Sequence, residues 1–543
     1  MEQAAQYILF PGRHLVNTRF QARYLRGLLT CEHEIVAGIK GGFALRPGAQ
    51  VIFAVTSANQ QNSRYNAIPF PIRMVGLDRF ASALAREVPA FPLRRRILGI
   101  PHYGHTENFV EVTLKEIEYQ TEGELRLVPA NTLVLCSTPE VIAGYERLGF
   151  SIAPAELGRT PRPATPGSLT AGVGESDDWK SMPHIDELAP SHVALFEDFP
   201  EVPRQIRRIY RDPITNQEGS LTENRNYNTY ARGMNEITAM KFRDIAAAIK
   251  PGRIADEGCA DGALLAEVSR VFRDSDLFGV DLSSEFASRF AERQRSGEFG
   301  NLYVHFFHRN LLEPIFEAGS IDTTICNSTL HELWSYAGGE PTVRKYLREK
   351  FRQLRPGGRL VIRDVVGPEN GGAQVLLECS RDDGADLPAG ELDLHTAREP
   401  DWIQSLSTRA KFLLFARDFR PASRGNSTIQ FEPREDGFLT SLAAAAEFLS
   451  KKDYADNWKS EVQEEFCFWN FAQWKSALRE AGFSIIENQP AEKANSRIYT
   501  NPWIVEHRFQ NHIQLFTLGA GGEKSPIPWP PTNMVLIGEK ALS

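Results

Sequence analysis

The hydrophobic positions of this chain follow two patterns that alternate along its length. Short apolar runs bounded by turn residues predict buried β-strands, and apolar residues every three to four positions predict amphipathic helices. In the C-terminal half, the predicted strands begin at residue 254 and continue with 277–281, 321–327, 359–364, 484–487 and 533–539, with helices at 346–354 and 471–481. Strands that alternate with helices favour a doubly wound parallel α/β sheet.

The N-terminal region has the same alternation. Its predicted strands are 7–12, 50–57, 96–101 and 132–137, and its predicted helices are 20–29, 72–87 and 139–148. We therefore expect two Rossmann-like units, since 543 residues exceed what one core supports. The first spans 1–200 and the second 226–543, and a basic amphipathic segment within 201–225 is expected to form a linker helix.

A long insertion interrupts the second unit. Residues 367–466 separate the strand 359–364 from the helix 471–481, which is more than an ordinary crossover requires. The insertion contains helical runs such as 438–449. We expect it to form a helical lobe that covers the site or shapes an acceptor pocket.

Two strand ends carry the candidate cofactor chemistry. The strand from 254 runs into a turn of small residues, Gly258-Cys-Ala-Asp-Gly262, and the strand 277–281 ends in Asp281. Such a turn lets a ligand approach the backbone, and the carboxylate can accept hydrogen bonds from ribose hydroxyls. A dinucleotide fingerprint would also need glycine at Ala260 and Ala263. The pattern therefore favours an adenosyl group over a nicotinamide dinucleotide.

By these motifs and the turn 355–358, residues 225–543 resemble the class I S-adenosylmethionine-dependent methyltransferases. The resemblance implies a seven-stranded sheet that ends in an antiparallel hairpin, with S-adenosylmethionine (SAM) as cofactor. Ala260 departs from the family's usual Gly-x-Gly-x-Gly turn. The cofactor residues implied by motif are Asp256, Gly258, Cys259 and Gly262 for the methionine end, Asp281 for the ribose, Leu282 for the adenine face, Asn310 for the adenine edge, Asn327 for the pocket floor and Tyr230 as a cover.

Three residues near the strand ends are candidates for catalysis. Methyl transfer requires alignment and, for a hydroxyl or a protonated amine, a base. His331 follows the strand 321–327, Glu332 is its neighbour, and Asp364 closes the next strand. A histidine at such a place also fits a packed, hydrogen-bonded role, and Asp364 also fits a role in shaping the pocket.

Within residues 1–200, several stretches resemble the nucleotidylyltransferases of the nicotinamide mononucleotide adenylyltransferase type. They are Gly12-Arg13, 66–74, 100–102 with 109–112, 136–141 with 148–150, and 168–180. The resemblance implies a nucleotide site at Gly12, Arg13, Arg73 and Ser137.

The catalytic residues of that second family are not kept. Its His-x-Gly-His motif falls on Thr18-Arg-Phe-Gln21, which supplies no imidazole. The sequence His102-Tyr-Gly-His105 spells the motif, but it follows the third strand instead of the first. We therefore expect a catalytically degenerate domain that binds a nucleotide or is purely structural.

Composition narrows the remaining possibilities. A formal net charge of −8 gives no overall attraction to nucleic acid or anionic membranes. No signal peptide or membrane-spanning apolar run is evident, and the six scattered cysteines are expected to stay reduced in the cytoplasm. The pairs His395 with Asp393 and His305 with His308 lack further spaced ligands, so no metal site is predicted.

These observations predict a SAM-dependent methyltransferase that acts on a small-molecule or nucleotide-linked substrate. The N-terminal domain would bind a nucleotide or shape the acceptor site. Two alternatives remain open, a bifunctional nucleotidylyltransferase and methyltransferase, and a non-enzymatic scaffold that senses both ligands. The sequence does not indicate the acceptor, the methylated atom or the oligomeric state.

Overall fold

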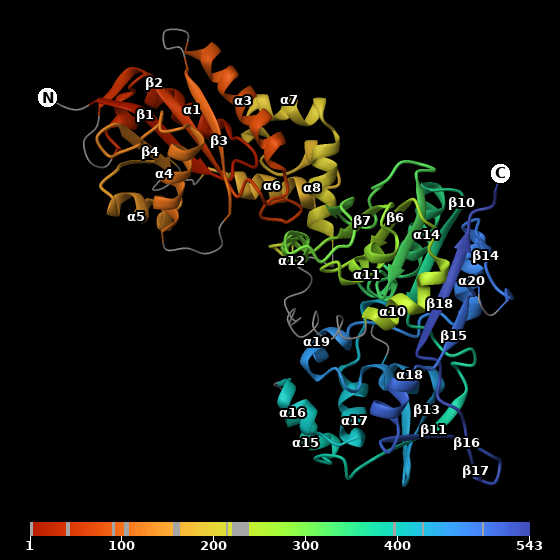
Figure 1. Cartoon of the computed structure of the whole chain (residues 1–543). Coiled ribbons are helices and arrows are strands. Elements are labelled where there is room, and N and C mark those ends of the chain that lie inside the picture. The colour runs from red at the N-terminus through yellow and green to blue at the C-terminus, as the bar shows by residue number, and fades with distance from the viewer. Residues whose placement is uncertain are drawn as a thin grey trace. The chain divides into compact units, whose positions relative to one another are not determined.

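The computed structural model describes residues 4–39, 44–88, 93–102, 108–155, 163–212, 216–219, 238–394, 398–425, 428–490 and 493–542. The chain divides into two compact units, Met1–Gly219 and Ser220–Ser543 (Figure 1). Each unit contains a parallel sheet with helices, as predicted. In the described ranges, no helix has the length and apolar character required to cross a membrane.

Unit 1 is built on a five-stranded parallel sheet. The strands are β1 (Ala4–Gly12), β2 (Ala44–Thr56), β3 (Arg95–Ile100), β4 (Thr132–Cys136) and β5 (Ser151–Pro154), in the order β3-β2-β1-β4-β5. Helices α1 (Arg19–Leu29) and α3 (Phe70–Glu87) pack on one face, and α4 (Phe109–Gln120) and α5 (Pro139–Arg147) on the other. The order reverses between β1 and β4, so their carboxyl ends mark the crevice where such sheets bind ligands.

The predicted linker helix is corrected by the structure. Helix α8 (Glu201–Arg211) packs against α6 (Pro166–Glu175) within unit 1, next to α7 (Pro190–Asp198). Its apolar residues Val202, Ile206 and Ile209 recur at helical spacing and are buried in the same hydrophobic cluster as α6. The apolar stripe of α8 therefore belongs to the core of unit 1, and the basic residues lie on its other positions.

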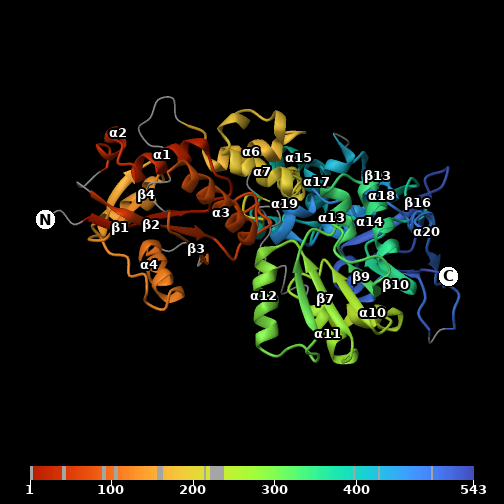
Figure 2. The same cartoon turned by 90° about the horizontal axis from the view of Figure 1, so that it is seen from above.

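Unit 2 is built on an eight-stranded sheet (Figure 2). Its main path runs β14-β18-β10-β9-β6-β7-β8, and β15 also pairs with β18. The strands are β6 (Arg253–Glu257), β7 (Asp276–Asp281), β8 (Val304–His308), β9 (Ile321–Asn327), β10 (Leu354–Asp364), β14 (Ser484–Ile485), β15 (Arg497–Tyr499) and β18 (Asn533–Glu539). The predicted count of seven is one strand short, because β15 has three mostly polar residues and no apolar run.

Helices connect the parallel strands of unit 2. They are α10 (Thr238–Ile245) before β6, α11 (Ala263–Val271), α12 (Ser284–Arg295), α13 (Leu330–Tyr336), α14 (Glu340–Gln353) and α20 (Phe471–Glu480). Strands β6 to β10 run parallel, whereas β14, β15 and β18 complete an antiparallel edge. All five parallel strands therefore present their carboxyl ends at one edge of the sheet.

The insertion is not only helical, which corrects the second part of the fold prediction. It contributes β11 (Gln374–Cys379), β12 (Phe431–Arg434) and β13 (Gly437–Ser441) to an antiparallel sheet that is completed by β16 (Ile513–Leu518) and β17 (Lys524–Pro526). The helices are α15 (Ala389–Leu394), α16 (Pro400–Ser405), α17 (Thr408–Asp418), α18 (Leu442–Lys451), α19 (Trp458–Glu461) and α21 (Pro502–Ile504). We term residues 367–466 and 502–526 the insertion lobe.

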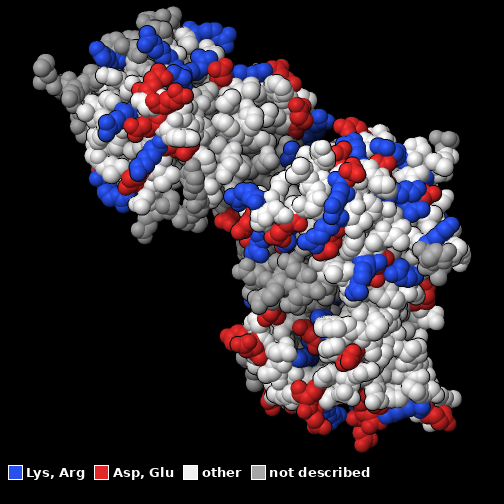
Figure 3. All heavy atoms as spheres, in the orientation of Figure 1, with Lys and Arg blue, Asp and Glu red and all other residues white. Residues whose placement is uncertain are grey.

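The surface carries both signs of charge. On the face visible in Figure 3, lysine and arginine residues are interspersed with aspartate and glutamate. This distribution agrees with the low net charge for a chain of this size and offers no continuous basic stripe on that face.

Candidate functional site

The predicted cofactor residues lie in a row along the carboxyl edge of the unit 2 sheet. Strand order places Asn310, just after β8, next to Asp281 of β7, followed by Asp256 of β6 and Asn327 of β9. Asp364 ends β10 beyond them. Neighbouring strands are about 4.8 Å apart, so this row suits an extended ligand that crosses several strand ends.

The turn between β6 and α11 requires glycine at its two ends. Gly258 and Gly262 have φ angles of 77° and 83°. A Cβ atom would lie 2.3 Å from Thr329 Oγ1 at Gly258 and 2.5 Å from the Phe290 ring at Gly262. Ala260 also has a positive φ, 48°, which a non-glycine residue rarely adopts. Its backbone N–H donates to Asp281 Oδ2 at 2.9 Å, which ties the turn to the tip of β7.

Backbone N–H groups hold the carboxylate of Asp281 in place, and this carboxylate can accept further hydrogen bonds. Its Oδ1 accepts from Ser283 N at 2.9 Å, and Leu282 is a further backbone donor to the carboxylate. A carboxylate offers about four acceptor positions, so capacity remains for a ribose hydroxyl. Burial raises the pKa of Asp281 to about 6, although the backbone donors act in the opposite direction.

Asp256 and Asn327 present buried oxygens that need donors. Asp256 is 1% exposed, and among the described residues neither of its carboxylate oxygens has a hydrogen-bond partner. Burial, followed by the charges of Asp281 and Glu257, raises its pKa to about 7. The side-chain oxygen of Asn327 is likewise unpartnered among those residues. Because buried polar groups are almost always bonded, these oxygens fit a ligand ammonium, as the methionine end of SAM would supply.

The other predicted cofactor residues follow the same strand ends. Their contacts point less directly to a ligand than those of Asp281 and Asp256. Cys259 is buried in the turn, and burial raises the pKa of its thiol well above the usual range. Leu282 is half-buried, and its carbonyl lies 2.7 Å from His308 Nε2. Asn310 is half-buried and accepts from Leu312 N at 2.9 Å. Tyr230 lies outside the described residues.

A buried ion pair supports the turn from the opposite face of the sheet. Lys350 Nζ of α14 lies 2.6 Å from Glu257 Oε1, and both side chains are 0% exposed. Glu257 immediately precedes Gly258, so the pair fixes the strand end from which the turn departs. Sequence reasoning missed it, because a charged residue near the end of a helix usually faces solvent.

His331 is held by two carboxylates. Its Nδ1 lies 2.7 Å from Asp364 Oδ1, and its Nε2 lies 3.5 Å from Glu464 Oε2. Burial acts to lower the pKa of His331, but Asp364 and Glu464 outweigh it and hold the pKa well above the usual range. Each ring nitrogen therefore faces a carboxylate oxygen, and neither is open to an acceptor substrate. The role of His331 as a general base stays a prediction and would require Glu464 to move away.

Asp364 anchors the start of α13. Its Oδ2 accepts from Thr329 N at 3.2 Å and Leu330 N at 2.8 Å, while Oδ1 accepts from Val365 N at 2.8 Å. Burial would raise the pKa of Asp364, yet His331 and the backbone donors lower it. These contacts fit the pocket-shaping role that was the alternative to catalysis.

Glu332 lies closer to the predicted ribose site. It is half-buried in the first turn of α13, and its charge contributes to the raised pKa of Asp281. Of the three predicted catalytic residues, it is the one whose charge acts on the cofactor row.

Glu464 is a residue that the sequence did not reveal. It comes from the insertion lobe, its side chain is 1% exposed, and its Oε1 accepts from Tyr336 OH at 3.1 Å. Tyr336 OH also lies 3.2 Å from Ser460 O. No spacing in the sequence relates residue 464 to residues 331 and 364, so only the fold could bring them together.

In unit 1, Arg73 has a structural set of partners. It is 1% exposed, and its guanidinium donates to the carbonyls of Arg13, Thr56 and Ser57 at 2.9 to 3.0 Å. Burial lowers its pKa to about 10. Arg73 therefore joins the loops after β1 and β2, and its place in the nucleotide site stays a prediction.

The other predicted nucleotide residues of unit 1 lie at the carboxyl ends of the neighbouring strands β1 and β4. Gly12 ends β1, and Ser137 follows β4, which is the neighbouring strand. Arg13 is exposed, donates to Tyr65 O at 3.1 Å and places its guanidinium 4.9 Å from the Tyr65 ring centroid.

The positions expected for the catalytic histidines start a helix instead. Thr18 Oγ1 accepts from Gln21 N at 3.0 Å, and Gln21 Oε1 accepts from Thr18 N at 3.2 Å. This reciprocal capping box stabilises the N-terminus of α1. His105 of the second motif lies outside the described residues.

Metal ligands form no cluster in the part of the chain that the structure describes. No group of three or more His, Cys, Asp or Glu side chains is placed there to hold an ion. His395 and the side chain of Asp393 lie outside that part.

Comparison with known proteins gives a partial match. Residues 255–362 match the family model described as a methyltransferase domain. This segment runs from β6 to β10 and contains the Gly258 turn, Asp281 and Asn327. The comparison with curated proteins found no match.

Several solved structures are similar to the chain at low identity. A SAM-dependent methyltransferase from Methanosarcina mazei has 16% identity and a TM-score of 0.27, covering 55% of this chain and 97% of its own. An O-methyltransferase family protein from Burkholderia thailandensis has 14% identity and a TM-score of 0.28, with coverages of 58% and 59%. Geranyl diphosphate C-methyltransferase from Streptomyces coelicolor A3(2) has 22% identity and a TM-score of 0.21, with coverages of 24% and 46%. The chain thus spans about half the length of the last two.

Proposed function

We propose that unit 2 transfers the methyl group of SAM to a small-molecule or nucleotide-linked acceptor. When bound, SAM supplies an activated methyl on a sulfonium, which is transferred by in-line displacement. The protein's part is to align the reactants and exclude water. The methyltransferase-domain match of residues 255–362 supports this reaction class.

One observation carries the proposal. The row of Asn310, Asp281, Asp256 and Asn327 presents acceptors at successive strand ends, and the oxygens of Asp256 are buried without partners among the described residues. A ligand with an adenosine at one end and an ammonium at the other matches this order. The Gly258 turn lies between them in the order of the strands, and its backbone N–H at Ala260 is tied to Asp281.

For unit 1, we propose a nucleotide-binding or acceptor-shaping role without nucleotidyl transfer. Gly12, Arg13 and Ser137 lie at the reversal of strand order, where open α/β sheets bind ligands. The capping box of Thr18 and Gln21 occupies the place of the family's catalytic imidazoles. Incubation of the full chain with ATP and nicotinamide mononucleotide should release no pyrophosphate, and release at a catalytic rate would support the bifunctional alternative.

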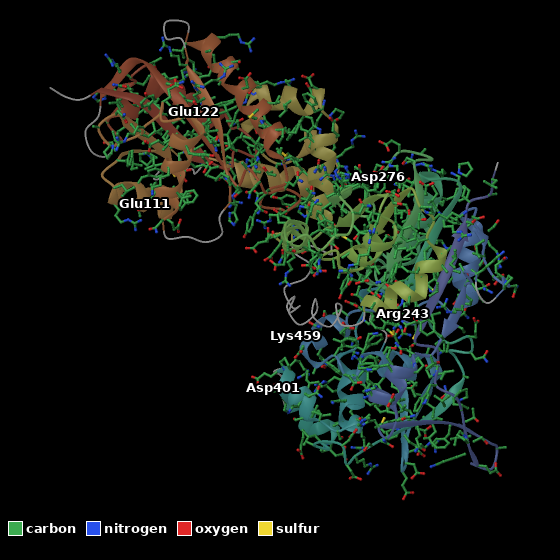
Figure 4. The ribbon with its side chains drawn as sticks, viewed as in Figure 1. Glu111, Glu122, Arg243, Asp276, Asp401 and Lys459 are labelled. Carbon is green, nitrogen blue, oxygen red and sulfur yellow. The ribbon has the colours of Figure 1, made fainter. Side chains whose placement is uncertain are left out.

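The cofactor assignment is tested by binding of S-adenosylhomocysteine (SAH). Calorimetry with the full chain should give one SAH per chain, and Asp281→Ala should weaken binding at least about 100-fold, because hydrogen bonding of the ribose to a charged acceptor is lost. The matched control is Asp276→Ala, at the exposed amino end of the same strand (Figure 4). Equal affinity of the two variants would refute the ribose site. Formation of SAH from SAM with any acceptor would exclude the scaffold alternative.

A further inference from the structure

The insertion lobe carries a group of stacked planar side chains. The ring centroids of Trp503 and His507 are 4.5 Å apart at an interplanar angle of 15°. The guanidinium carbon of Arg508 lies 5.6 Å from the centroid of the Trp503 ring and 4.8 Å from that of the Tyr454 ring. Arg508 thus joins two aromatic rings from separate stretches of the lobe. We term Tyr454, Trp503, His507 and Arg508 the aromatic stack.

The two large rings of the aromatic stack are accessible to a ligand. Trp503 is 48% exposed and Tyr454 is 37% exposed. Within the described residues, no ring or cation other than His507 and Arg508 covers Trp503. Exposed aromatic side chains that lie together are typical of binding surfaces, because their apolar area is otherwise left in water.

A π-helical segment, Val505–Phe509, assembles the stack. It follows α21, where Asn501 Oδ1 accepts from Trp503 N at 3.0 Å, and His507 Nδ1 lies 2.9 Å from Trp503 O. A π-helix aligns residues five positions apart, which brings Arg508 to Trp503. Both Arg508 and His507 belong to the turn after Trp503, so they approach the indole from its C-terminal side. The exposed part of the indole therefore lies on its other side.

The aromatic stack lies close along the chain to the carboxyl end of β10. Tyr499 pairs with Asn533, where β18 begins, and its hydroxyl donates to Asp244 of α10 at 2.6 Å. Asp244 also accepts from Arg363, the residue before the end of β10, at 2.9 Å. Trp503 follows Tyr499 by only four residues. The stack is therefore presented by the part of the lobe that joins the edge of the sheet where the predicted cofactor row lies.

The chemistry of the stack fits a planar ligand. Aromatic side chains stack on the faces of heteroaromatic rings, and this contact needs no charge on the ring. The guanidinium of Arg508 adds donors for carbonyl or ring-nitrogen acceptors at the edge of such a ring. An aliphatic ligand would offer no flat surface to Trp503 and Tyr454.

We propose that the methyl acceptor carries a planar heteroaromatic ring, which stacks on the exposed side of Trp503 with Tyr454 and Arg508 at its border. This inference rests on the proposed function and narrows the class of acceptor. The stack anchors the acceptor and takes no part in the transfer itself.

Small rings without ribose or phosphate test the stack directly. Calorimetry with the full chain and saturating SAH, which fills the predicted cofactor site, should detect binding of at least one of caffeine, cytosine and nicotinamide. Succinimide has carbonyl acceptors but no aromatic ring and should not bind. Trp503→Leu should weaken ring binding by about 5- to 100-fold, because the stacking contact is lost. Trp503→Phe keeps an aromatic ring and should bind better than Trp503→Leu does.

Matched variants complete the test. Tyr303→Leu removes a 57% exposed ring just before β8, at the amino edge of the sheet, and should leave ring binding unchanged. Lys459→Met removes an exposed cation from α19 of the lobe and should also leave it unchanged (Figure 4). Arg508→Lys keeps the charge but not the plane, and should weaken ring binding by about 2- to 5-fold.

The outcomes separate this inference from the proposed function. If SAH binds but none of the three rings does, or if Trp503→Leu binds them as the wild type does, the acceptor site is not the aromatic stack and the cofactor assignment stands. If SAH does not bind, the proposed function fails and the acceptor role of the stack fails with it. An unchanged affinity for SAH shows that Trp503→Leu is folded. Should that variant not fold, Tyr454→Leu decides, and ring binding equal to that of the wild type would overturn the inference.

Discussion

The Nε2 atom of His331 lies 3.5 Å from Oε2 of Glu464, and this contact joins helix α13 to the insertion lobe. Both side chains are almost fully buried, and Asp364 holds the other ring nitrogen. Three charges thus meet at a place where water has little access. Their contribution to the free energy of unfolding should therefore depend strongly on pH.

We expect Glu464→Gln to destabilise unit 2 by about 1–3 kcal/mol, because a buried charged acceptor becomes neutral. The folded-state pKa of His331 is raised above 6.5, so its stabilising contribution is complete below pH 6.5 and is lost as pH rises through the folded-state pKa. The effect of the variant should therefore be larger at about pH 6 than at about pH 9. Urea unfolding at both pH values measures it.

The control for that variant is Asp401→Asn, an exposed carboxylate on α16 of the insertion lobe (Figure 4). It should change the free energy of unfolding by less than about 0.5 kcal/mol. An effect of Glu464→Gln that is equal at both pH values would show that His331 is not the charged partner.

SAM binding should depend on pH through Asp256 and Asp281. Their pKa values are raised to about 7 and about 6, so both carboxyls are mostly protonated below these values in the unliganded protein. A cationic ligand favours the ionised forms, and its affinity should rise as pH increases from about 5 to about 8. Asp256→Asn should remove the upper part of this rise. A flat profile in the wild type would contradict the proposed contact of Asp256 with the ammonium.

Lys350→Met should cost about 3–5 kcal/mol of stability, because Glu257 would keep a buried charge without its partner. Combining it with Glu257→Leu should recover most of the loss, since replacing both members of a buried pair by apolar residues is often neutral. Urea unfolding of the two variants measures the difference. Lys345→Met, on the exposed side of α14, is the control, and a loss of the same size there would point to a general effect of shortening charged side chains.

Arg73→Met should lower the stability of unit 1 by about 3 kcal/mol, because three hydrogen bonds to loop carbonyls are lost. Thermal unfolding of the full chain should show a lower midpoint for the transition of unit 1. Arg86→Met, at an exposed position near the end of α3, should leave it unchanged. If Arg73→Met kept its stability but lost nucleotide binding, the result would support the ligand-contacting role predicted from sequence.

Local pattern was sufficient where a strand is buried along its whole length. Strands β9 and β18 have the bounds predicted from sequence, 321–327 and 533–539. In β18 a run of four apolar residues marks the strand, and in β9 the β-branched residues between Ile321 and Ile325 have the same effect. The Gly258 turn and Asp281 were also recognisable, because their spacing is set by one strand, one helix and the next strand.

Long-range partners could not be predicted. Strand β11 needs β16, which lies more than 130 residues further along the chain, and a short apolar run alone does not reveal such pairing. The same holds for Glu464, whose partner His331 is in another part of the sequence. The hydrogen bonds of Arg73 to loop carbonyls could not be predicted either, because they depend on the packing of two loops that the motif does not describe.

The sheet of the insertion lobe is assembled from two separate stretches of chain. Strands β11 to β13 come from residues 374–441, and β16 and β17 come from 513–526. Removing residues 367–466 would therefore expose the edge of β16 that β11 now covers. Such an unpaired strand edge can pair with other chains and cause association. The lobe therefore cannot be removed or transplanted as one continuous segment.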